Sequence, residues 1–142
     1  MELDFDKRYQ TMLILWFALL MSVAMYFVVS QLAPPATAPP NSILTFTLTA
    51  VGTFLVGISF VIKRKLLRRS VDEQDLGLVQ KALVIACAIC EAAAVLGLVE
   101  RFAVSGRDYL LLFVIAAVGI ALHFPRRSQL EAASYKTANR ES

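Results

Sequence analysis

Four long runs of apolar residues, separated by short polar segments, set the main constraint on how this chain folds. The runs cover residues 11–32, 43–62, 78–99 and 109–124. At about 1.5 Å per residue in a helix, the first run reaches about 33 Å, which matches a hydrocarbon core of about 30 Å. A lone strand in lipid would leave its backbone polar groups unsatisfied, so each run is expected to be an α-helix. The pattern therefore predicts an all-α, polytopic membrane protein with four transmembrane helices.

The composition agrees with this prediction. The chain is 58% hydrophobic and 18% charged, whereas soluble domains are about 45–50% apolar and about a quarter charged. Because the apolar excess is concentrated in the four runs, we expect one membrane domain over residues 1–142, arranged as an up-down bundle without a separate soluble domain. Residues 126–142 lack an apolar stripe and are expected to form a mobile cytoplasmic tail.

The distribution of Lys and Arg predicts the orientation of the bundle. With four spans, both chain ends and the connection between the second and third runs lie on one side. That side holds twelve of the 14 basic residues, and only Arg101 and Arg107 lie on the other. Basic residues concentrate on the cytoplasmic side, so we expect a protein of the cytoplasmic membrane with both termini inside. The net charge of +3 is then a topology signal and does not indicate a nucleic-acid partner.

The third run is the richest of the four in small residues. Small side chains spaced four apart let helix backbones approach closely. We therefore expect this helix to be the most enclosed one, with six helix-packing residues: Ala82, Ala86, Cys90, Ala94, Ala93 and Gly97.

A carboxylate, Glu91, interrupts this run about 20 Å from its cytoplasmic end. A central charge costs at least about 2.5–3.5 kcal/mol to insert, so such a group is normally paired, protonated or next to water. At the same depth we expect hydroxyl groups from two other runs, those of Ser22 and Tyr26 on the first and of Thr49 and Thr53 on the second. These residues are the candidate ion-binding site. Two interpretations stay open: a site for a proton or cation, and a protonated Glu that only fixes helix packing.

Residues 68–99 also resemble a known family. A basic loop is followed by a helix that carries Glu-Ala and then Gly-Leu-Val, at positions Arg68, Arg69, Glu91, Ala92, Gly97, Leu98 and Val99. This segment is similar to the carboxylate-bearing helix of the rotor-ring proteolipid (subunit c) of ATP synthases. The resemblance implies that Glu91 would be the ion-carrying carboxylate.

Other chemical motifs are weak. Cys87 and Cys90 lie three apart in an apolar run, and without further ligands nearby except Glu91 we expect them to serve packing. The single histidine, His123, excludes a His-pair haem within one chain and is expected at the cytoplasmic interface. We interpret the basic run at residues 63–70 as a topology signal, and binding of anionic lipid is the alternative interpretation. With no catalytic motif, we expect no enzyme activity, no cofactor and no metal.

Three functional hypotheses follow. The first is a packing or assembly subunit of a membrane complex. The second is a proton- or cation-translocating module centred on Glu91. The third is a cofactor-holding subunit of a respiratory complex that uses His123 across an interface. The expected partners are the lipid bilayer and either further copies of the chain or another membrane subunit.

Overall fold

The chain is all-α, as predicted. The computed structural model describes residues 2–34, 37, 39, 41–104 and 108–134, and these residues form helices without any strand. The helices are α1 (Glu2–Leu32), α2 (Ser42–Glu73), α3 (Leu76–Ala103), α4 (Tyr109–Leu122) and α5 (Arg127–Ser134).

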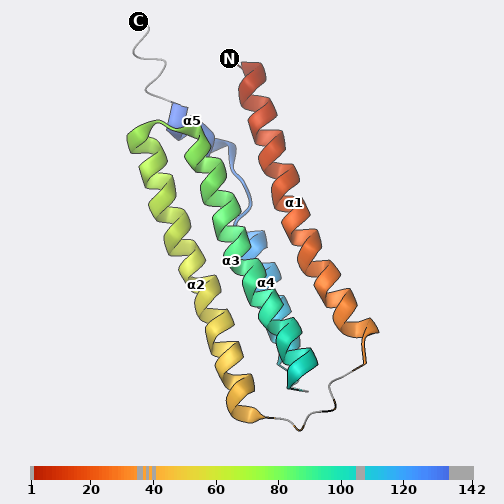
Figure 1. Ribbon diagram of the computed structural model, residues 1–142. Coiled ribbons are helices and arrows are strands. Elements are labelled where there is room, and N and C mark those ends of the chain that lie inside the picture. Colours follow the sequence, from red (N-terminus) through yellow and green to blue (C-terminus); the bar gives the residue numbers. More distant parts are fainter. Residues whose placement is uncertain (1, 35–36, 38, 40, 105–107, 135–142) are drawn as a thin grey trace, which may run out of the picture.

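Helix α3 lies at the centre of the bundle. It packs against each of the other four helices, whereas α1 and α2 make no contact with each other within the described ranges. The start of α1, the α2–α3 turn and α5 lie at one end of the molecule, and the end of α1 and the start of α2 lie at the other (Figure 1). All six small residues expected to pack on α3 are buried. Their size allows the neighbouring helices to pack closely around the α3 axis.

Helix α2 is longer than its apolar run. Beyond residue 62 we expected a charged linker, yet the helix continues to Glu73. Lys, Arg and Leu favour helices, and Arg69 pairs with Glu73 one turn later. The helix ends where Gln74 takes a left-handed conformation with φ 55°. Asp75 then caps α3, its Oδ1 accepting from the Gly77 N–H at 2.7 Å.

Several helices are compatible with a membrane protein. Three of them, α1, α2 and α3, are long and apolar enough to cross a membrane, and a fourth span results if α4 and α5 are taken together across a bend of 47°. Alone, α4 has 14 residues, which is about 21 Å of helix and shorter than a hydrocarbon core.

Helix α5 differs from the mobile tail that we expected from residue 126 onward. Its Leu130 and Ala133, three positions apart on one face, are buried. The Arg127 guanidinium lies 3.3 Å from Asp6 Oδ1 and 5.0 Å from the centre of the Tyr9 ring on α1. Residues 127–134 are therefore a docked helix, and the rest of the expected tail, residues 135–142, lies outside the described residues.

Candidate functional site

The carboxyl group of Glu91 lies between α3 and α1. Its Oε1 accepts a hydrogen bond from the Tyr26 hydroxyl at 3.0 Å and another from the Ser22 hydroxyl. Ser22 and Tyr26 are four residues apart and so share one face of α1. The structure thus brings three of the predicted site residues together, and we call Glu91, Ser22 and Tyr26 the Glu91 cluster. All three side chains are half-buried.

The other two predicted site residues, Thr49 and Thr53, do not join this cluster. The Thr53 hydroxyl donates to the Thr49 carbonyl at 2.8 Å within α2. The Thr49 hydroxyl is buried and has no hydrogen-bond partner among the described residues. Counting residues fixes the height of a side chain along the bundle but not the side of the helix on which it lies. Glu91 bonds toward α1, which α2 does not contact.

The Glu91 cluster offers one carboxyl and two hydroxyl groups. Both hydroxyls donate to the same oxygen, and no described residue donates to Oε2. In the part of the chain that the structure describes, no group of three His, Cys, Asp or Glu side chains is close enough to hold a metal ion. Oε2 of Glu91 can therefore carry a proton or accept a hydrogen bond from another molecule.

A second polar cluster, which the sequence reasoning missed, joins α2, α3 and the end of α4. The Ser59 hydroxyl lies 2.8 Å from His123 Nε2 and 3.4 Å from Cys90 Sγ. The Lys63 ammonium donates to the His123 carbonyl at 3.0 Å. We call Ser59, Lys63, Cys90 and His123 the junction cluster, and all four are buried. Its one sequence signal is the spacing of Ser59 and Lys63, one turn apart where the apolar run ends.

The ring of His123 is enclosed within the bundle. The residue is 1% exposed, its Nε2 is hydrogen-bonded, and the centre of its ring lies 4.4 Å from that of Phe60. The side chain of the buried Lys63 extends to the end of α4, where its ammonium donates to the His123 carbonyl. The imidazole is therefore not presented on the surface of the bundle, and the cofactor-holding hypothesis stays a prediction.

At the opposite end of the bundle, a second acid links the end of α3 to the residue before α4. Glu100 is fully buried, and its Oε1 accepts from the Asp108 N–H at 3.1 Å. Next to it, Arg101 donates to the Ser30 carbonyl at 3.1 Å and lies over the Tyr109 ring. These contacts tie α1 and α4 to the end of α3. Arg107, the other basic residue expected at this end, lies outside the described residues.

Comparison with known protein families, curated proteins and solved structures gives no match. The similarity of residues 68–99 to rotor-ring proteolipids stays a prediction.

Proposed function

We propose that the protein is a non-enzymatic subunit of the cytoplasmic membrane, with both termini inside, that binds a helix of another membrane protein beside Glu91. The observation that supports this function is the incomplete pairing of Glu91. The side chain is half-buried in the middle of an apolar helix, and its hydrogen bonds from described residues go to one oxygen only.

A charged carboxyl group is costly to place in the hydrocarbon core of a membrane. A central charge costs at least about 2.5–3.5 kcal/mol, and each hydrogen bond between membrane helices returns only about 0.6 kcal/mol on average. Two hydroxyl donors therefore leave part of the cost uncovered. A donor from a partner helix, bonded to Oε2, supplies the remaining stabilisation.

The surface beside Glu91 suits the close approach of such a helix. Ala88 and Ala92 are exposed on α3, four positions apart, next to the carboxyl group. Exposed small residues at this spacing are typical of helix–helix contacts in membranes. On the α1 side, Met21 and Met25 are 50% and 63% exposed, and flexible Met side chains adapt to a partner surface.

Replacing Ala92 with Phe is expected to dissociate the partner, because a large ring prevents the backbones from approaching. Native mass measurement after extraction in mild detergent reads out the complex. The matched control is Ala50→Phe, an equally large change at an exposed position of α2, and it should leave the complex intact. A wild-type protein that is always extracted as a monomer would contradict the assembly function. An assembly made only of this chain would show that the partner is a second copy.

A second candidate function, reversible proton binding at Glu91, is favoured by the two hydroxyl donors on Oε1, which leave Oε2 to hold the proton. In proteoliposomes carrying the protein, Glu91→Gln should abolish proton flux, since an amide keeps the size of the carboxyl but carries no titratable proton. Glu131→Gln, which removes an exposed carboxyl on α5, is the control and should conduct normally. Absence of flux in the wild type, or equal flux in Glu91→Gln, rejects this function.

A further inference from the structure

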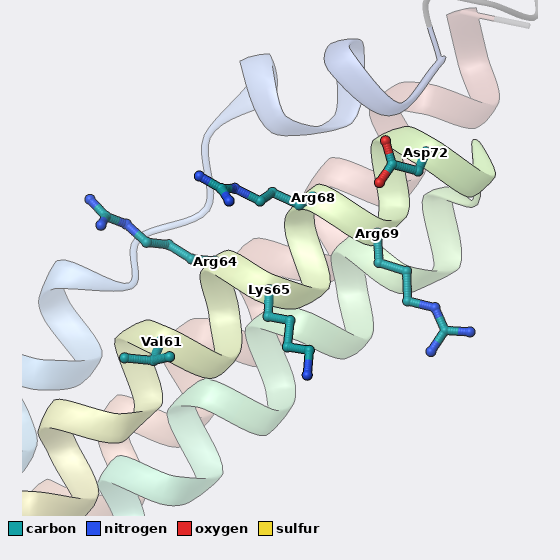
Figure 2. Close-up of a pocket in the computed structure, with 6 residues that line it drawn as sticks. All are labelled: Val61, Arg64, Lys65, Arg68, Arg69 and Asp72. Atoms are coloured by element: carbon teal, nitrogen blue, oxygen red, sulfur yellow. The ribbon is translucent and has the colours of Figure 1, made fainter.

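The strongest charged feature outside the Glu91 cluster is a groove on α2, beyond the apolar run. Figure 2 shows Arg64 and Arg68 extending to one side of α2 and Lys65 and Arg69 to the other. We call this surface the basic groove, and it is lined by Val61, Arg64, Lys65, Arg68, Arg69 and Asp72. Four basic groups thus gather within two turns of one helix, with one acid at the far end.

Most of these cations have no anionic partner among the residues that the structure describes. Arg69 is paired with Glu73. Across the described ranges, Arg64, Lys65 and Arg68 form no ion pair, even though Asp72 lines the same groove. Arg127 on α5, by contrast, pairs with Asp6 on α1. The basic groove keeps an excess of positive charge for an external anion.

The height of the basic groove matches a layer of lipid headgroups. Residues 43–62 cover about 30 Å, the thickness of the hydrocarbon core. Arg64 to Arg69 then lie about 3–10 Å beyond its edge, and each headgroup layer is about 5–8 Å thick. Val61, 63% exposed, lies just inside the edge. The groove therefore offers apolar surface to the start of an acyl chain and cations to a phosphate.

The geometry points to a binding site for an anionic phospholipid, and we propose that its phosphate lies between Arg64 and Arg68, which extend to the same side of α2. Guanidinium groups hold phosphate oxygens through paired hydrogen bonds, which an ammonium cannot reproduce. A topology signal needs only positive charge on the correct side of the membrane. A lipid site needs Arg at these two positions, one turn apart. This difference makes the proposal testable without reference to the Glu91 cluster.

The test is native mass spectrometry of the purified full chain with phosphatidylglycerol and with phosphatidylcholine of the same acyl chains. The wild type should retain phosphatidylglycerol preferentially. The double variant Arg64→Gln/Arg68→Gln should weaken phosphatidylglycerol binding about 30-fold, because each basic residue near a membrane surface contributes about 1 kcal/mol. Its phosphatidylcholine binding should not change.

Two further variants separate the site from general charge effects. Lys7→Gln/Arg8→Gln removes the same charge from exposed positions of α1 at the same end of the molecule, and it should bind phosphatidylglycerol like the wild type. Arg64→Lys/Arg68→Lys keeps the topology signal and should bind with intermediate affinity. Equal retention of both lipids by the wild type, an equal loss in the α1 control, or wild-type affinity in the Lys pair would each overturn the proposal. So would displacement of the lipid by free glycerol phosphate at equal concentration.

Discussion

Gly119→Val is expected to lower the free energy of unfolding by about 3 kcal/mol, the upper end of the usual cost of overpacking. Gly119 lies on α4 where three helices meet. A Cβ atom at this position would lie 2.9 Å from Cys90 Sγ on α3 and 2.9 Å from Val56 Cγ1 on α2. Both atoms belong to short side chains with a single rotatable bond, so these side chains can make little room for the added methyl groups. Unfolding by detergent titration, followed by the helical circular dichroism signal, measures the loss.

Gly57→Val is the matched control for this experiment. It is the same substitution in a neighbouring helix, and nothing lies within 4 Å of the Cβ that it would add. The change in unfolding free energy should stay within about 0.5 kcal/mol, because only the difference in helix propensity and surface contacts is altered. If the two Val variants lost the same stability, the close approach of α2, α3 and α4 at Gly119 would be wrong.

His123→Ala is expected to cost about 3 kcal/mol of unfolding free energy. The substitution leaves a cavity beside Phe60 and removes one hydrogen-bond partner of the Ser59 hydroxyl, and removal of a buried ring usually costs about 3–5 kcal/mol. The exposed neighbour Leu122, 66% accessible, supplies the control Leu122→Ala, which should change stability little. The same detergent titration compares the two.

A double-mutant cycle isolates the hydrogen bond in the junction cluster. Ser59→Ala and His123→Ala, measured alone and together, should give a coupling energy of about 0.6 kcal/mol, the average for hydrogen bonds between membrane helices, and at most about 1.7 kcal/mol. A coupling of zero would show that Ser59 and His123 do not interact. In that case His123 contributes through packing alone.

The Glu91 cluster illustrates how far residue counting reaches. Depth along the helices correctly placed Ser22 and Tyr26 level with Glu91, because a helix rises by a fixed distance per residue. Counting residues also placed Thr49 and Thr53 level with Glu91, yet neither forms a hydrogen bond to Glu91. Their side of the bundle depends on how α2 is rotated and on which helix it contacts, and no local pattern in the chain contains that information.

The junction cluster shows the opposite case. Ser59 and His123 are 64 positions apart, and each, taken alone, has the pattern of an ordinary polar residue near a helix end. Only the packing of α2 against α4 brings them together and excludes water from both. The burial of Lys63 has the same origin, since its ammonium finds the free carbonyl at the end of α4. The extension of α2 to Glu73 follows from its own helix-favouring residues. We did not predict it, because the charged residues beyond position 62 were interpreted as a linker.

The amino-acid sequence by itself determined the all-helical class, the extent of the apolar core of each long helix and the small-residue character of α3. Lipid and apolar packing require every backbone group to bond within its own helix, and this requirement depends only on composition and length. The tertiary structure alone decided which faces meet. It placed Glu91 against α1, buried His123 in contact with Ser59 and packed α5 against the end of the bundle. The reason is that the rotation of each helix about its axis follows from long-range packing.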